Sequence, residues 1–112
     1  MNEIERSKQI LAGMSIEEKV GQLFVVRCPQ EGAKDAVATY KLGGFTLYAV
    51  DFEHRTPDTL RDAIREWNSV ANLPLFLAAD EEGGRVVRAS KFPQFRKEPF
   101  PNPQTLYAKG GL

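Results

Sequence analysis

The sequence predicts an α/β fold built on a small parallel sheet. Three short runs rich in apolar, β-forming residues lie at 24–28, 45–50 and 75–79, which is typical of strands. Segments with apolar residues at helical spacing separate these runs, and such alternation favours parallel strands joined by right-handed crossovers. The third run stops on a carboxylate, Asp80, at the strand end beyond which parallel α/β sheets bind their ligands.

The composition is that of one small folded domain. The 112 residues are 42% hydrophobic, enough to build a core. Fifteen basic and fifteen acidic side chains cancel, which argues against nucleic acid or an anionic membrane as partner. A single cysteine excludes an internal disulfide, and no run approaches the ~20 apolar residues of a membrane span or the pattern of a secretory signal. We therefore expect a cytoplasmic protein.

Two helices are expected before the first strand. The first covers residues 2–12 and is predicted to end with Gly13 as a left-handed cap. Ser15 and Glu18 then form the S-x-x-E pattern of a capping box, which starts the second helix. We interpret this pair as purely structural.

Two further helices are expected between the strands. The segment 32–41 has apolar residues at helical spacing and is predicted to end at the glycine pair 43–44. Thr56-Pro57 starts the next helix, with a capping hydroxyl and a proline at the first helical position, and this helix runs to about Ala71. Trp67 lies on its apolar face. We interpret Trp67 as an anchor against the sheet, not as a platform for sugar stacking.

Three polar or reactive residues follow the first two strands. Cys28 ends the first strand, but a thiolate would need a positive partner, so we interpret it as a small buried apolar side chain. Asp51 follows the second strand as Asp80 follows the third. Asp51 either shares the edge with Asp80 or opens a polar turn with Glu53 and His54, and we favour the turn. His54 is interpreted as an exposed turn histidine.

The third strand and the turn after it carry the main site hypothesis. The run 75–79 shows no alternation of apolar and polar residues, which predicts a strand buried on both faces. Gly83 and Gly84 let the chain turn sharply beside Asp80. Arg85 and Arg88 return on the next segment, where they can face the Asp80 carboxylate or donate hydrogen bonds to a polar ligand.

The last part of the sequence changes character. Four prolines at 93, 99, 101 and 103 exclude both a helix and a central strand. Residues 89–104 are therefore predicted to form an irregular loop, packed through interleaved phenylalanines, before a helix begins near residue 105. Three parallel strands leave two exposed edges and a poorly covered face. The sequence thus looks like the beginning of a larger structure.

Four ordered motifs resemble a known family. They are MSIEEKVGQLF at 14–24, LGGF at 42–45, DEEGGRVVR at 80–88 and FPNP at 100–103. In this order and spacing they resemble the N-terminal domain of glycoside hydrolase family 3, and most closely the β-N-acetylhexosaminidases of peptidoglycan recycling. The resemblance implies a TIM-type (β/α)8 barrel, which takes about 250 residues. Residues 1–112 would then be an N-terminal portion of this barrel, an incomplete barrel with its first three β/α units.

The resemblance also assigns roles within the acidic glycine motif. Asp80 corresponds to the aspartate that accepts hydrogen bonds from sugar hydroxyls, and Arg88 to the arginine that assists it; both contacts are charge-assisted. Glu82 and Arg85 are expected to support the loop. Family members often carry glutamine where this sequence has Glu81, a minor departure.

The resemblance implies a retaining glycosidase acting on terminal β-linked N-acetylglucosamine, without cofactor or metal. Its two catalytic groups, which must lie about 5 Å apart, fall after the matched part of the family sequence. No catalytic residue is therefore predicted here, and we expect the isolated chain to be inactive. Two alternatives are open. One is a non-catalytic module that binds sugar or self-associates through exposed sheet edges, and the other is an independent flavodoxin-like enzyme with a reactive Cys28.

Overall fold

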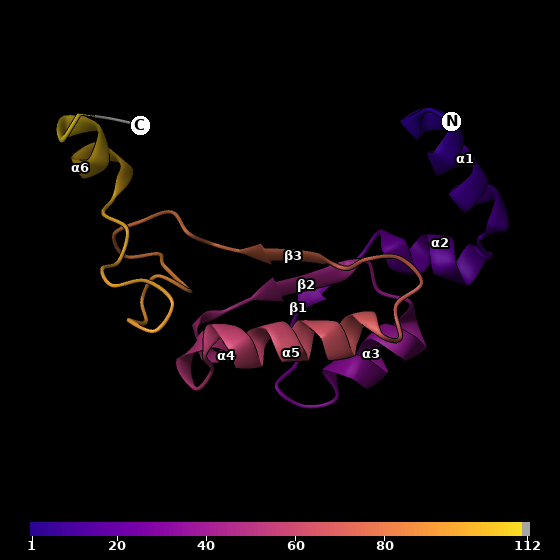
Figure 1. The fold of residues 1–112 in the computed structure, drawn as a ribbon, viewed down its shortest axis with the longest axis horizontal. Helices are drawn as coiled ribbons and strands as arrows, with labels where there is room; N and C mark the ends of the chain where they lie inside the picture. Colours follow the sequence, from indigo (N-terminus) through magenta and orange to yellow (C-terminus); the bar gives the residue numbers. More distant parts are fainter. Residues whose placement is uncertain (111–112) are drawn as a thin grey trace.

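The computed structural model describes residues 1–110. Helices and strands alternate along the chain after two N-terminal helices, as the sequence predicts. In chain order the elements are α1 (Glu3–Gly13), α2 (Ile16–Gln22), β1 (Val25–Arg27), α3 (Ala33–Tyr40), β2 (Gly44–Leu47), α4 (Ala49–Glu53), α5 (Pro57–Asn68), β3 (Phe76–Ala79) and α6 (Pro103–Ala108) (Figure 1).

The three strands form one open sheet in the order β1-β2-β3, and both pairings are parallel. This confirms the predicted parallel arrangement. Figure 1 shows α3 and α5 on one side of the sheet, while α1 and α6 stand at opposite ends of the molecule. The radius of gyration is 17.1 Å, against about 13 Å for a compact domain of this length. The described chain is therefore an open layer, and its sheet is not closed into a barrel.

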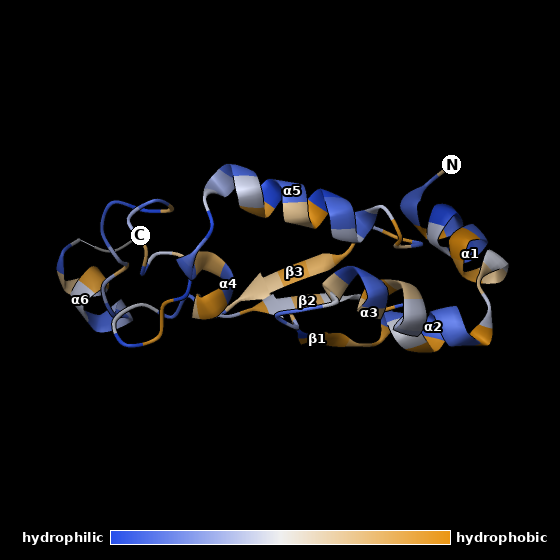
Figure 2. Ribbon diagram, turned by 90° about the horizontal axis from the view of Figure 1, so that it is seen from below, coloured by the Kyte–Doolittle hydropathy of each residue, from blue (hydrophilic) through white to orange (hydrophobic). Residues whose placement is uncertain are grey.

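The core lies between the sheet and its helices. Phe45 is completely buried, and its ring meets Trp67 of α5 edge-on at 5.3 Å between centroids. The apolar side of α5 faces the sheet, while its outer surface is hydrophilic (Figure 2). Trp67 is 4% exposed, so its prediction as a core anchor is confirmed. Edge-to-face aromatic pairs of this kind add about 0.5–1.5 kcal/mol to the area they bury.

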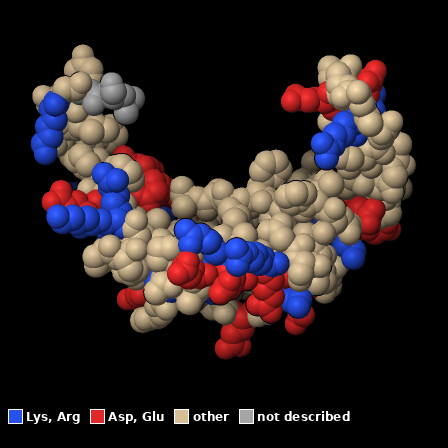
Figure 3. Space-filling model, viewed as in Figure 1, with Lys and Arg blue, Asp and Glu red and all other residues tan. Residues whose placement is uncertain are grey.

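The prediction that the third strand is buried on both faces is wrong. All four residues of β3 are exposed, and Phe76 is 70% exposed. The reason is its position at the edge of the sheet. Within residues 1–110, β3 pairs with β2 alone, no layer covers the face that carries Phe76, and Leu77 on the helix side is still 38% exposed. Figure 3 shows this hollowed side between the two ends of the molecule, with a largely uncharged floor.

The second strand is shorter than predicted because a helix replaces its last residues. β2 ends at Leu47, and α4 begins at Ala49. The Asp51 carboxylate accepts a hydrogen bond of 2.7 Å from the Tyr48 amide, which satisfies a free N–H at the start of this helix. Asp51 is 3% exposed. Its role is structural, as we favoured, but it is a buried cap and not part of an exposed polar turn.

Three helix ends also differ from prediction. α1 includes Gly13, which has no positive φ, and ends without a left-handed residue. The left-handed residue after α3 is Lys41, with φ 54°, and not a glycine. The glycine pair serves close packing instead, since a Cβ on Gly44 would collide with the carbonyl of Phe76.

α5 ends at Asn68, before the predicted Ala71. The Asn68 side chain donates to the Ile64 carbonyl and accepts from the Leu75 amide at 3.0 Å. It thereby closes the helix and fixes the entry to β3. The Ser15–Glu18 capping box is present, with reciprocal hydrogen bonds of 2.8 and 3.1 Å. Within residues 1–110, no helix is both long and apolar enough to cross a membrane.

Candidate functional site

The register of the sheet gathers polar side chains at one corner of its uncovered face. Arg27, Thr46 and Ala78 are aligned across the three strands. Because side chains two residues apart point to the same face, Tyr48 and Asp80 continue this row beyond the strand ends. The alternate positions, such as Phe45, face the helices. Arg27, Tyr48 and Asp80 therefore lie together at the carboxyl edge, on the face that no helix covers.

Arg88 returns to this corner from the loop after β3. Its guanidinium carbon lies 5.2 Å from the centre of the Tyr48 ring, and its Nη2 lies 3.6 Å from Oδ2 of Asp80. The structure thus brings Arg88, but not Arg85, to the Asp80 carboxylate. A separation of 3.6 Å is too long for a hydrogen bond, and the Asp80 side chain is 52% exposed. Both Asp80 oxygens are therefore free to accept hydrogen bonds from a ligand.

Arg88 also has an unused donor. Its Nε is buried and makes no hydrogen bond within the described part of the chain. A buried donor left without a partner costs about 1–3 kcal/mol. Such an orphaned donor calls for an explanation, which can be strain, a bound water or a functional role.

Sequence reasoning missed Arg27 and Tyr48. The guanidinium of Arg27 stacks on the Tyr48 ring at 4.7 Å, so one aromatic ring contacts two arginines. Each residue left a signal. Arg27 is the one charged residue in the run 24–28, and Tyr48 interrupts the apolar pattern near the end of the second run. The strand register, which the sequence does not give, was needed to place them together.

Glu81 organises the loop that holds Arg88. Its carboxylate accepts hydrogen bonds from the amides of Arg88 (2.8 Å), Ala89 and Ser90 (3.1 Å), and from the Ser90 hydroxyl (2.7 Å). Burial alone would raise the pKa of Glu81, but these hydrogen bonds outweigh it and lower the pKa below its usual value. We call this arrangement the Glu81 clamp.

The expectation that Glu82 and Arg85 support the loop is not met. Neither makes a hydrogen bond or an ion pair with another of the residues 1–110, and both are exposed. Glu81 provides the support instead, because a carboxylate at this position reaches three amides in a row. The residue treated as a minor departure from the family pattern is thus the one that shapes the loop.

Two of the sequence motifs pack against each other. Gly83 and Gly84 have φ values of 88° and 65°, which confirms the predicted sharp turn. The Gly84 amide donates to the Phe100 carbonyl at 2.9 Å, and a Cβ on Gly83 would collide with the carbonyl of Pro101. The DEEGGRVVR and FPNP motifs are therefore two sides of one structure, which fixes the path of the chain beside Asp80.

The remaining candidates have structural roles. Cys28 is 2% exposed, and burial, reinforced by nearby Asp51, raises its pKa to about 12. Asp51 is held by Tyr48 and by the Gln30 amide at 3.0 Å. The His54 side chain is 86% exposed, with only Glu53 nearby at 4.0 Å. The interpretations of Cys28 as a buried apolar residue and of His54 as an exposed turn residue are confirmed.

The site is an open corner and not a deep cavity. A groove of about 780 Å³ runs between the Glu81–Glu82 turn and α6, and neither Asp80 nor Arg88 lines it. We therefore place the site by the convergence of side chains from β1, β2 and β3 and their loops. Within residues 1–110 no group of three metal-ligating side chains comes together.

Comparison with protein families identifies the family of this chain. Residues 15–106 match the model of the glycosyl hydrolase family 3 N-terminal domain. This chain belongs to glycosyl hydrolase family 3. Comparisons with curated proteins and with solved structures found no match. The match contains all four corner residues and the Glu81 clamp, so the corner is part of the family 3 domain, and the family's substrates are carbohydrates.

Proposed function

We propose that this family 3 chain contributes the first three β/α units of a TIM-type barrel and binds a sugar through Asp80 and Arg88. The observation that supports this most is the convergence of Arg27, Tyr48, Asp80 and Arg88 at the carboxyl edge. In (β/α)8 enzymes the active site is built at that end of the strands. A half-exposed carboxylate beside a guanidinium suits adjacent sugar hydroxyls.

The distribution of side chains on the uncovered face supports the barrel part of the proposal. At the amino end this face carries apolar residues, Val25 and Phe76, which are 43% and 70% exposed. At the carboxyl end it carries the polar corner. A barrel has this polarity, because its interior is filled by layers of apolar side chains below a polar active-site rim. Further strands beyond β3 would bury Phe76 and complete the site.

The proposed substrate is a terminal β-linked N-acetylglucosamine, as in the hexosaminidases of peptidoglycan recycling, and a cytoplasmic location is part of the same proposal. The chemistry would be retaining hydrolysis, with two catalytic groups about 5 Å apart. No residue of this chain is proposed for either role. Asp80 and Arg88 would hold the ring so that its anomeric carbon meets a nucleophile supplied by later units.

Binding of N-acetylglucosamine to the 112-residue chain tests the sugar site. In an NMR titration of the ¹⁵N-labelled protein, we expect shifts at Asp80, Arg88 and Tyr48, with a dissociation constant on the order of millimolar for so open a site. Asp80→Asn should weaken binding about tenfold or more, because two charge-assisted hydrogen bonds lose their strength. Asp62→Asn on the outer surface of α5 is the control. Equal effects of the two substitutions would contradict the assignment.

Hydrolysis of an aryl β-N-acetylglucosaminide tests the missing catalytic groups. The isolated chain should show no turnover above a heat-treated sample. Turnover that disappears in Asp80→Asn would refute the proposal that the catalytic groups lie in later units.

The exposed β3 strand favours a second candidate function, self-association. Its free edge and Phe76 could pair with another chain. Size-exclusion chromatography with light scattering separates the cases, since a folded monomer across the micromolar range would exclude assembly. Phe76→Lys should dissociate any oligomer formed through this strand.

A further inference from the structure

The corner beside Asp80 has an excess of positive charge that neutral-sugar binding does not use. Arg27 and Arg88 both lie over the Tyr48 ring, and Asp80 is the one carboxylate paired with either of them within residues 1–110. The Arg27 side chain makes no ion pair or hydrogen bond within residues 1–110, and its guanidinium lies over the Tyr48 ring.

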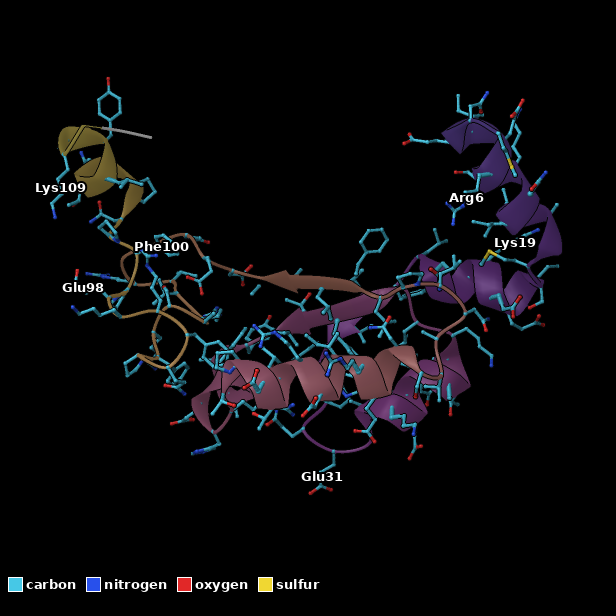
Figure 4. The ribbon with its side chains drawn as sticks, in the orientation of Figure 1. Arg6, Lys19, Glu31, Glu98, Phe100 and Lys109 are labelled. Atoms are coloured by element: carbon cyan, nitrogen blue, oxygen red, sulfur yellow. The ribbon has the colours of Figure 1, made fainter. Side chains whose placement is uncertain are left out.

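The acidic residues closest in sequence to Arg27 and Tyr48 do not neutralise this charge. Glu31 lies on the far side of the molecule, beyond the helix layer (Figure 4). Asp51 is buried and committed to the Tyr48 amide and to Gln30. The guanidinium carbons of Arg27 and Arg88 lie 4.7 and 5.2 Å from the centre of the Tyr48 ring, so this corner carries two positive charges against the single carboxylate of Asp80.

We propose that Arg27 and Tyr48 form a carboxylate-binding subsite beside Asp80 and Arg88, so that the saccharide whose terminal N-acetylglucosamine lies at this corner also carries an acidic group. The inference rests on the proposed sugar site and deepens it. A planar carboxylate accepts two parallel hydrogen bonds from a guanidinium. The exposed guanidinium of Arg27, which has no hydrogen-bond partner within residues 1–110, can supply such a pair of bonds, and Tyr48 holds it in place by cation–π contact.

Asp80 and Arg27 recognise different groups because one accepts hydrogen bonds and the other donates them. Asp80 accepts hydrogen bonds and so selects hydroxyl groups, while Arg27 only donates and so favours the acid. Arg27 is the residue that sets the preference, because Arg88 is shared with Asp80. A neutral sugar would leave Arg27 unused.

D-Glucuronate and D-glucose provide a matched pair of probes, since they differ only in the oxidation of C6. We would titrate each into the ¹⁵N-labelled 112-residue chain at low, constant ionic strength, with acetate as the carboxylate without a sugar. The wild-type protein should bind glucuronate roughly fivefold or more tightly than glucose or acetate. Added salt should reduce this preference.

Arg27→Gln is the test variant and Arg85→Gln the matched control. Both replace an exposed arginine with a polar side chain and change the net charge equally. Arg27→Gln should abolish the preference for glucuronate over glucose, whereas Arg85→Gln should preserve it.

The outcomes separate this inference from the proposed function. Equal affinity for glucuronate and glucose, or equal losses in the two variants, would overturn the carboxylate subsite while leaving the sugar site intact. Acetate binding as tightly as glucuronate would overturn the saccharide part. If neither sugar binds, and Asp80→Asn does not affect N-acetylglucosamine, the sugar site itself fails and the subsite fails with it.

Discussion

Phe45 and Phe76 lie in neighbouring strands of one sheet but in opposite environments. Phe45 is fully buried against Trp67 on the helix side, whereas Phe76 is 70% exposed on the other face. The helices therefore cover the side of the sheet that carries Phe45, while within residues 1–110 no layer covers the side that carries Phe76. The polar corner lies on this same uncovered face. A layer that packed on Phe76 at the amino end would therefore lie next to the proposed sugar site at the carboxyl end.

The largest effect expected from this contrast is on stability. Phe45→Ala should lower the free energy of unfolding by about 3–5 kcal/mol, because it removes a buried ring and leaves a cavity beside Trp67. Phe76→Ala should change it by no more than about 0.5 kcal/mol, as for most exposed positions. Urea unfolding followed by circular dichroism would measure both. Similar losses in the two variants would show that something covers the Phe76 face in solution.

The same contrast explains what sequence analysis predicted and what it missed in the fold. Alternation of apolar runs with amphipathic helices is a local signal, and it gave the parallel sheet correctly. Burial of β3 is not local, because it depends on the layer packed against the strand. Residues 75–79 are all apolar, as in a buried strand, but residues 1–110 do not bury β3.

Sequence analysis likewise predicted some residues of the site and missed others. The apolar run ending on Asp80 placed that residue at the carboxyl edge, and Arg88 followed from the motif. Arg27 and Tyr48 could not be assigned, because their meeting depends on the register of β1 against β2. Glu81 was overlooked since three of its four hydrogen-bond partners are backbone amides, which cannot be recognised from the side-chain sequence.

The Glu81 clamp gives a prediction of intermediate size. Glu81→Gln should weaken the loop by about 1–2 kcal/mol, since a neutral amide accepts hydrogen bonds less strongly than a carboxylate and can accept through one oxygen only. Hydrogen exchange of the Arg88, Ala89 and Ser90 amides should become faster. Glu82→Gln, at the exposed neighbouring position, should leave these amides unchanged, and matching effects would rule the clamp out.

Acidification should act on the same clamp. The pKa of Glu81 lies below its ordinary value of 4.5 in the folded chain, so its contribution to stability is complete above the unfolded pKa. This contribution is lost as the pH falls below 4.5 and through the lower folded value. Amide exchange at 88–90, corrected for its intrinsic pH dependence, should show lost protection in that range. In Glu81→Gln the loss should be absent, and an unchanged profile would mean that another acid controls the loop.

The smallest effect concerns two consecutive residues at the end of β1. Cys28 lies in the helix-side core and Arg27 on the uncovered face. Cys28→Ala should cost about 1 kcal/mol by removing one buried atom, whereas Arg27→Ala should stay within about 0.5 kcal/mol.

Thiol labelling sharpens this last contrast. With its pKa raised to about 12 by burial, Cys28 should react at pH 8 at least about a hundredfold more slowly in the folded chain than in urea. Rapid labelling of the folded protein would revive the alternative of a flavodoxin-like enzyme with a reactive cysteine. Slow labelling, together with an unchanged rate in Arg27→Ala, would show that the arginine beside Cys28 does not activate the thiol. Any function of Arg27 would then be at the uncovered face of the sheet.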